Sequence, residues 1–425
     1  LNLALMRALG VSSLEALTPG RFRLLPVLAG VGVVGLIFAL VRPAGVGKAG
    51  AAAGLVATSP LAVYFSRMAI HETLLVAVAL TLVWCGQRAW RSRRWGWVMA
   101  AGASLGLLMS VKATWVIIVF SLGAALLLFW PRRTLEALGR IGAARWALAV
   151  GVALLVSFAL HTNFGGNLAG FADSWRTFFI YKTGAAHAKP WFYFWTDVLT
   201  FRKVAGGVSG EGLIVALALV GAGLGLLRRE ASVPALVKWL ALAGTLQIAV
   251  YSVLSYKTPW LVLTAVVFLA PLAGWGASQL VAGANRIGRR VAVMGLGLAW
   301  IFFQVLPVCS VNFGSDERLD VPYVYAPTKR EAVQAMERAL ATVGPDELIA
   351  VVGDDYWPMP WFLRDRRSTT GYYEAMPADS EAFSVAFFCG PASRDVERGS
   401  TLALFELRPG YYVKGVRLAE NERLP

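Results

Sequence analysis

Long apolar runs separated by short polar stretches dominate the first three quarters of the chain. A helix that crosses a membrane needs about 20 predominantly apolar residues. Ten runs approach this length, at about 24–41, 48–65, 69–87, 96–111, 113–131, 146–161, 210–228, 235–254, 260–281 and 291–309. The pattern therefore predicts a mainly α, polytopic membrane helix bundle of about ten spans.

From about residue 311 the pattern changes to short apolar stretches and one amphipathic segment. TKREAVQAMERALATV (328–343) has helical periodicity, and ELIAVVG (347–353), SVAFFCG (384–390) and STLALFEL (400–407) have the character of strands. A helix combined with such strands predicts a small α/β domain. We therefore divide the chain into a transmembrane domain at 1–310 and an α/β domain at 311–425.

Arginine-rich stretches predict how the bundle is oriented. They lie at 42–48, 88–95, 132–145, 228–229 and 286–290, and they fall on one side if ten spans alternate. Cytoplasmic loops of membrane proteins carry an excess of Lys and Arg, so we assign this side to the cytoplasm. The α/β domain and the polar groups near Ser66, Lys112 and Tyr256 are then extracytoplasmic. We expect a multi-pass protein of the plasma membrane with its active site on the outer face.

Composition and motifs support a membrane protein and argue against nucleic-acid binding, a zinc finger and a cytoplasmic nucleotide enzyme. Hydrophobic residues make up 57% of the chain and charged residues 15%, with a net charge of +15. The positive charge lies in short loops, without the basic stripe that nucleic-acid binding requires. Cys85, Cys309 and Cys389 form no CxxC or CxxH, so a zinc-finger site is disfavoured, and unpaired thiols are favoured over a Cys309–Cys389 disulfide. No P-loop, GxSxG or HExxH is present, which argues against a cytoplasmic nucleotide enzyme.

The segment VYFSRMAIHETLLV (63–76) places Arg67, His71 and Glu72 at the edge of an apolar run. Ionisable groups there are costly unless they meet water, a partner or a ligand. Arg67 and His71 share a face if the helix that we expect from Met68 is continuous. Two interpretations stay open. Arg67 reaches lipid headgroups with Glu72 as its partner, or it binds a phosphate while Glu72, with His71 beside it, binds a metal or sugar hydroxyls.

Two further cations lie at the same predicted face. Lys112 separates two apolar runs in GLLMSVKATWVII (106–118), where reaching the interface and binding a phosphate stay equally open. Lys257 lies between Tyr256 and Thr258 in YSVLSYKTPWLVL (251–263), where a lipid-phosphate contact is favoured. Trp260 is typical of an interface belt.

The loop at 161–199 is rich in aromatic residues and has the amphipathic core FADSWRTFFIYK, which we expect to lie flat on the membrane. His161, Asp173 and His187 lack the spacing of metal ligands, so a metal site there is disfavoured.

With these residues assembled, the sequence resembles the archaeal and bacterial flippase-activity-associated membrane proteins. The stretches that carry the resemblance are SPLAVYFSRMAIHETLLV, YSVLSYKTPWLVL, VPYVYAPT and GDDYWPMPWFLRD. That family belongs to the C-type (GT-C) glycosyltransferases, together with protein O-mannosyltransferases and the lipid A aminoarabinose transferase.

The resemblance implies transfer of a sugar from a polyprenyl-phosphate donor to a glycan, lipid or protein acceptor on the extracytoplasmic face. Glu72, with His71, matches an acidic catalytic position. Arg67, Lys112 and Lys257 match cations near the donor phosphate, and Tyr256, Thr258 and Trp260 accompany Lys257 as substrate contacts. Some relatives hold a divalent metal, for which Glu72 and His71 are the candidate ligands.

In such relatives a first membrane helix and a loop with an acidic base precede the segment that matches LNLALMRALG. We therefore expect an upstream segment before Leu1. Two other functions stay open: a non-catalytic protein that binds or helps to flip lipid-linked oligosaccharides, and a secondary transporter. The transporter is disfavoured because the charges gather at one membrane face and no internal repeat is visible.

Overall fold

The computed structural model describes residues 2–13, 16–130, 139, 141–180, 188–204, 207–227, 233–313, 320–324, 328–353, 356–377, 382–408 and 410–418. Its contacts divide the chain into two units. The helical unit comprises Arg23–Gly314 and Asp320–Tyr323, and the sheet unit comprises Leu1–Phe22, Ser315–Leu319 and Val324–Pro425. The domains predicted from the sequence place 1–22 with the membrane helices, whereas the contacts group these residues with the C-terminal unit.

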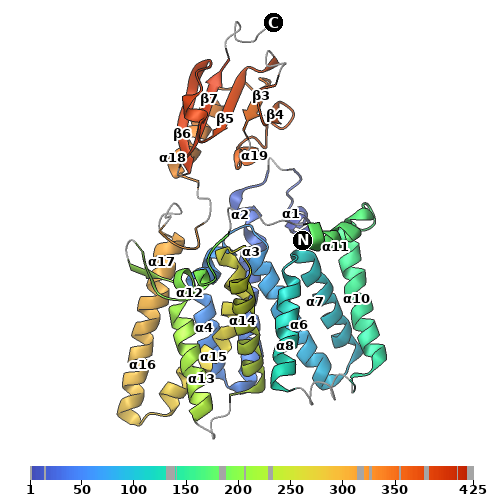
Figure 1. The fold of residues 1–425 in the computed structure, drawn as a ribbon, viewed down its shortest axis with the longest axis vertical. Coiled ribbons are helices and arrows are strands. Elements are labelled where there is room, and N and C mark those ends of the chain that lie inside the picture. The colour runs from blue at the N-terminus through green and yellow to red at the C-terminus, as the bar shows by residue number, and fades with distance from the viewer. Residues whose placement is uncertain are drawn as a thin grey trace. The chain divides into compact units, whose positions relative to one another are not determined.

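Every apolar run predicted as a span contains a helix of the helical unit (Figure 1). The helices are α3 (Leu24–Val41), η1 (Arg42–Ala44), α4 (Val46–Ala57), α5 (Pro60–Ser66), α6 (Glu72–Ser92), α7 (Trp95–Val111), α8 (Trp115–Phe129), α10 (Ala143–His161), α11 (Ala169–Ile180), α12 (Tyr193–Asp197), α13 (Gly212–Leu227), α14 (Ala235–Val253), η3 (Pro259–Val262), α15 (Leu263–Ala282), α16 (Arg286–Trp300), η4 (Ile301–Val305) and α17 (Leu306–Phe313). Strands β1 (Arg202–Val204) and β2 (Gly207–Ser209) form a small antiparallel pair.

Six helical stretches in the part of the chain that the structure describes are long and apolar enough to cross a membrane. They are 24–44, 72–92, 143–161, 235–253, 259–282 and 286–313. A seventh is added if α4 and α5, which are bent by 61°, count as one span, and α7, α8 and α13 are shorter apolar helices. The chain is thus a multi-pass membrane protein, while the count of ten spans stays a prediction.

The core of the helical unit is the stretch that contains η3 and α15. It is 89% buried, whereas α10 and the stretch 286–313 are each 11% buried. α15 packs against α4, α13 and α14. A side chain at Gly274 would clash with the α4 backbone at Ala52, and one at Gly276 would clash with the α13 backbone at Leu217. Small residues allow helices in membranes to approach this closely, so α15 holds α4 and α13 in fixed positions.

The sheet unit confirms the small α/β domain. Its elements are α1 (Asn2–Ala8), α2 (Pro19–Phe22), α18 (Arg330–Ala341), β3 (Ile349–Val352), α19 (Met359–Phe362), β4 (Thr370–Tyr373), β5 (Val385–Gly390), η6 (Ser393–Asp395), β6 (Ser400–Arg408) and β7 (Tyr411–Arg417). The strand order is β4-β3-β5-β7-β6, with β3 parallel to β4 and β5, and β7 antiparallel to β5 and β6. Ala332 and Met336 of α18 pack against Val351 and Phe387 on one face of the sheet. The predicted helix and three strands correspond to α18, β3, β5 and β6. All three cysteines are free.

Candidate functional site

Glu72 and Lys112 form an ion pair inside the helical unit, although they are 40 residues apart in the sequence. Glu72 is the first residue of α6 and is only 5% exposed. Lys112 directly follows α7, where extended backbone ends the helix. Because α6 and α7 pack side by side, the ammonium of Lys112 reaches the carboxylate and donates a hydrogen bond to its Oε1. The pairing of Glu72 with Arg67 that the sequence left open is thus wrong, because Glu72 pairs with Lys112 instead.

Aromatic and hydroxyl side chains surround this ion pair. A small cavity, called the Glu72 site below, is lined by the pair and by Leu75, Thr114, Tyr251, Trp260, Leu261 and Thr264. The Lys112 Nζ atom lies 5.9 Å from the centroid of the Trp260 ring, close enough for the ammonium to be attracted to the aromatic face. The free space amounts to about 10 Å³, which is room for one water molecule. The ion pair itself therefore fills the site.

The two charges of this pair differ in burial. The side chain of Glu72 is 7% exposed and that of Lys112 is 28% exposed. A buried carboxylate without a cation costs several kcal/mol, so the pairing with Lys112 offsets the cost of burying Glu72. An ionised carboxylate can take a proton, and an ammonium with access to the outside can bind an anion. The site therefore combines a base with an anion-binding group.

Arg67 and His71 lie on the turn between α5 and α6 rather than in the Glu72 site. α5 ends at Ser66 and α6 begins at Glu72, so the continuous helix predicted from Met68 and the shared face of Arg67 and His71 are wrong. A new helix that begins at Glu72 gains from an acidic residue at its positive N-terminal end. The guanidinium of Arg67 lies 4.9 Å from the centre of the Phe313 ring, and His71 is exposed.

In the turn that contains Tyr256, Lys257 and Thr258, the lysine side chain binds backbone carbonyl groups. Lys257 is 2% exposed, and its Nζ donates to the Lys189 carbonyl at 3.1 Å and to the Leu254 carbonyl. Tyr256 forms an isolated bridge with Ala188, and Thr258 is buried just before η3. None of the three lines the Glu72 site. Of the substrate contacts predicted on this stretch, the structure brings only Trp260 there.

Replacing Lys257 by Met is expected to destabilise the protein by about 1–3 kcal/mol, because two backbone carbonyl groups lose the donor that the buried ammonium supplies. A fall in the midpoint of thermal unfolding, measured in detergent, checks this. Lys203→Met, at an exposed position, is the matched control and should leave the midpoint unchanged. An unchanged midpoint together with loss of donor binding would instead support the phosphate contact predicted for Lys257.

The side chains near Glu72 do not by themselves fit a divalent metal. Among the described residues, no three His, Cys, Asp or Glu side chains gather in one place. The Glu72 carboxylate is bound by an ammonium and His71 lies on the exposed turn, whereas hard divalent cations require several oxygen ligands. His161 contacts the Ser157 carbonyl, Asp173 pairs with Arg176, and His187 lies outside the described residues. The predicted metal therefore enters no step below.

Tyr251, Thr114 and Thr264 line the Glu72 site but were not predicted from the sequence. Tyr251 is 3% exposed in the last turns of α14, and Thr264 is 4% exposed at the start of α15. A hydroxyl group near the end of an apolar run was the available signal. It is weak, because single hydroxyl side chains are common in membrane helices.

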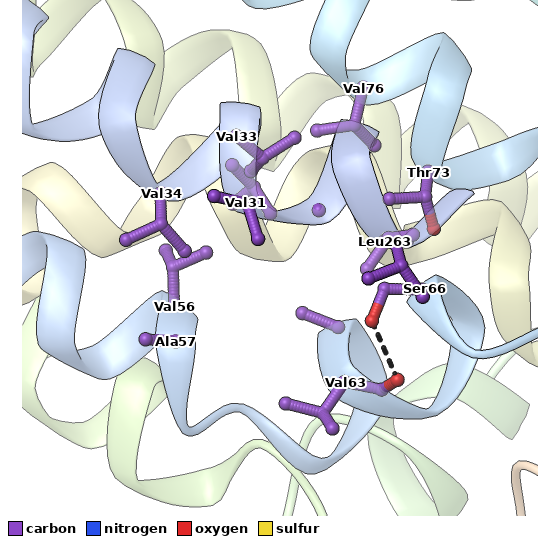
Figure 2. A pocket seen from close by; sticks show the side chains of 14 residues that line it. Val31, Val33, Val34, Val56, Ala57, Val63, Ser66, Thr73, Val76 and Leu263 are labelled. Atoms are coloured by element: carbon purple, nitrogen blue, oxygen red, sulfur yellow. Dashed lines mark hydrogen bonds between the residues drawn. The ribbon is translucent and has the colours of Figure 1, made fainter. Parts of the chain in front are cut away.

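A larger, apolar cavity adjoins the same helices (Figure 2). Its volume is about 350 Å³. It is lined from α3 by Val27, Gly30, Val31, Val33 and Val34, from α4 by Val56 and Ala57, from α5 by Ala62, Val63 and Ser66, from α6 by Thr73 and Val76, and from α15 by Leu263 and Val267. Figure 2 shows Ser66 and Thr73 together at one end, with the Ser66 hydroxyl donating to the Val63 carbonyl at 2.8 Å. This cavity thus has long apolar walls and one polar end.

The polar end of the apolar cavity lies next to the Glu72 site in the sequence. Thr73 follows Glu72 on α6, and Leu263 precedes Thr264 on α15. The same two helices thus line both spaces.

Two kinds of comparison connect this arrangement with known proteins. Residues 16–162, which include Glu72 and Lys112, match the family model described as dolichyl-phosphate-mannose-protein mannosyltransferase. The whole chain superposes on ArnT from Cupriavidus metallidurans in the apo state, with a TM-score of 0.61, 16% identity, and coverage of 100% of this chain and 87% of that chain. This chain has the GT-C glycosyltransferase fold.

The GT-C fold is also seen in a second match, ArnT from Cupriavidus metallidurans bound to undecaprenyl phosphate. The TM-score is 0.58 at 15% identity, over 97% of this chain and 86% of that chain. No curated protein matches the chain in sequence. The GT-C resemblance and the membrane helix bundle with a small sheet unit are thus confirmed, and membership of the flippase-associated branch stays a prediction.

Proposed function

We propose that this chain is an integral-membrane glycosyltransferase that moves a sugar from a polyprenyl-phosphate donor to a hydroxyl acceptor on the extracytoplasmic face of the plasma membrane. The observation that carries the proposal is the Glu72–Lys112 pair, packed under Trp260 and adjoining an apolar cavity. The comparisons support it through the fold and through the match of residues 16–162.

Lys112 and Glu72 suit the two charge changes that the reaction requires. The acceptor oxygen forms a bond to the anomeric carbon of the sugar, and the bond from that carbon to the phosphate oxygen breaks. Lys112 stabilises the negative charge that develops on the departing polyprenyl phosphate. Glu72 takes the proton from the acceptor hydroxyl. Trp260 offers an aromatic face on which the sugar packs.

The donor must open the Glu72 site before it reacts. With about 10 Å³ of free space, the site accommodates neither a phosphate nor a sugar while Glu72 and Lys112 are paired. The donor phosphate therefore replaces Glu72 as the partner of Lys112. This exchange releases Glu72 at the moment when a base is needed.

The apolar cavity suits the isoprenoid chain of such a donor. Its volume of about 350 Å³ lies within the range of roughly 300–1,000 Å³ that is usual for small-molecule sites. Branched aliphatic side chains form the walls, and Thr73 at the polar end directly follows Glu72 in the sequence. One amphiphilic ligand would then occupy both spaces.

The decisive test is sugar transfer by the purified full chain in lipid nanodiscs. A panel of radiolabelled polyprenyl-phosphate hexoses is the donor, and release of polyprenyl phosphate is measured with and without hydroxyl acceptors. Release that depends on donor and acceptor supports the proposal. Saturable donor binding without release by any donor would overturn it in favour of a binding or flipping-associated protein.

Replacing Val34 by Trp, which fills the apolar cavity, is expected to raise the KM for a long-chain donor about tenfold, equivalent to about 1.4 kcal/mol of lost binding. The KM for a donor with a single isoprene unit should hardly change, because little of such a ligand reaches the cavity. Leu28→Trp is the matched control, since Leu28 lies on the same helix, is 51% exposed and does not line the cavity. Equal effects of the two variants on KM, or equal effects on both donors, would show that the isoprenoid chain does not occupy the cavity.

A further inference from the structure

The bend between α4 and α5 is held by side chains from distant segments. On the α5 side, Glu211 Oε1 accepts a hydrogen bond from the Leu61 amide at 2.8 Å, and Asn312 Nδ2 donates to the Pro60 carbonyl at 3.4 Å. On the α4 side, Thr58 Oγ1 lies 2.9 Å from Gln304 Oε1 and accepts from Trp300 Nε1 at 2.7 Å. The α4–α5 bend of 61° is therefore fixed from both sides.

Glu211 is aimed at this bend by a rigid piece of backbone. It lies just before α13, is fully buried, and its amide donates to the Val198 carbonyl at 2.9 Å. The preceding Gly210 has φ of 122°, and a side chain there would collide with the Thr200 carbonyl. Only glycine adopts this conformation readily. The backbone at Glu211, which carries the carboxyl side chain, is therefore held in place.

The role of Glu211 follows from the chemistry of a helix start. The first amides of a helix have no partner within it. Ser59 Oγ accepts from the Ala62 amide at 3.0 Å, and Glu211, 150 residues away from Leu61, accepts from the Leu61 amide. Without Glu211 that amide would be buried and unsatisfied, which native structures avoid. The carboxyl of Glu211 thus caps α5 from outside the helix.

α5 in turn contacts the Glu72 site. Leu61 and Phe65 lie one turn apart on α5, and both are fully buried. The Phe65 ring meets the Trp260 ring edge-on, with centroids 5.9 Å apart and planes at 86°. Trp260 lies beneath the ammonium of Lys112. A shift of α5 would therefore displace Phe65 and, through it, Trp260.

We propose that Glu211 is a positioning residue for the Glu72 site: its carboxyl oxygen fixes the first turn of α5, and α5 fixes Trp260 through Phe65. The effect on transfer rests on the proposed function, whereas the capping of α5 does not. Within the described residues no cation pairs with Glu211. The oxygen that accepts from Leu61 is thus the feature that matters, and the charge of the carboxyl is not.

Two conservative variants separate the length of the Glu211 side chain from its acidic character. Glu211→Gln keeps an oxygen at the same distance without an acid, and Glu211→Asp keeps the acid but is one methylene shorter. We expect Gln to retain kcat/KM within about twofold. We expect Asp to lower kcat/KM about tenfold, mainly through kcat, because donor binding by Lys112 persists while small misplacements of reacting groups are costly.

Hydrogen exchange of the peptide that spans 59–72 gives a second readout, which does not depend on catalysis. Glu211→Asp should lose protection there and retain it in α10, and Glu211→Gln should keep protection in both. Equal loss in both variants would overturn the inference in favour of a role for the charge, and unchanged exchange in Asp would overturn it outright. The expected exchange pattern in a protein that transfers no sugar would leave the cap established and defeat only the proposed function.

Discussion

Glu72→Gln is expected to lower kcat for sugar transfer by at least about a hundredfold, the usual scale of a lost general base. Gln has nearly the same shape, and its oxygen still accepts from Lys112, so the fold should persist. The amide cannot take the proton of the acceptor. Initial rates of polyprenyl phosphate release at saturating donor and acceptor measure the effect. Glu337→Gln, the same chemical change on an exposed position of α18, is the control and should transfer at the normal rate.

The same Glu72 variant also makes a prediction about donor binding that separates an enzyme from a binding protein. In the proposed mechanism the donor phosphate competes with Glu72 for Lys112, so removal of the carboxylate charge should leave donor affinity unchanged or increase it. Equilibrium binding of a non-hydrolysable donor analogue tests this. Normal turnover in Glu72→Gln would exclude Glu72 as the base. Weaker donor binding would show that Glu72 contacts the donor rather than competing with it.

The helices were predictable where hydrophobicity decides the structure, and the strands only in part. α3 and α14 coincide almost residue for residue with predicted runs, because a membrane allows a backbone without partners only in a helix. β4 is four residues long, and in β7 Lys414 and Gly415 interrupt the apolar alternation. These two strands are stabilised by their neighbours in the sheet rather than by their own sequence.

The candidate site was predictable in its residue types but not in its pairings. A charged residue at the edge of an apolar run requires a partner, which is why Glu72 and Lys112 could be identified. That they pair with each other depends on the packing of α6 against α7, and a single sequence does not encode this contact in any local pattern. The predicted helix from Met68 was wrong, because α6 begins only at Glu72, whose partner Lys112 lies 40 residues away.

Lys257 and Glu211 show two ways in which prediction from the sequence fails: a residue can be given the wrong partner, or it can be missed. Lys257 has the sequence context of a phosphate ligand, yet its ammonium holds two carbonyl groups inside the protein. Glu211 begins an apolar run and gives no sign of a role until the structure places its carboxyl at Leu61. In both cases a backbone group of a distant segment is a partner, at Lys189 for Lys257 and at Leu61 for Glu211, and such contacts cannot be read from a pattern of side chains.

Lys112→Gln is expected to raise the donor KM by about ten- to a hundredfold, because a hydrogen bond to a charged group contributes about 1.5–3 kcal/mol. It should also destabilise the protein by about 1–3 kcal/mol, since Glu72 would be left buried without a cation and Lys112 is itself partly exposed. Donor titrations of the transfer rate and thermal unfolding measure the two effects. Lys203→Gln, which removes an exposed cation, is the control.

The double variant Glu72→Gln, Lys112→Gln separates these two roles of the ion pair. For stability, the second substitution should recover much of what Lys112→Gln loses, because no unpaired charge stays buried. For transfer, it should recover nothing, because the reaction needs the base and the cation at the same time. Recovery of both properties would mean that the pair serves only to hold α6 against α7. Recovery of stability without recovery of transfer would mean that the fold does not need the Glu72–Lys112 ion pair. The two charged groups would then serve the reaction, in which Lys112 binds the phosphate of the donor.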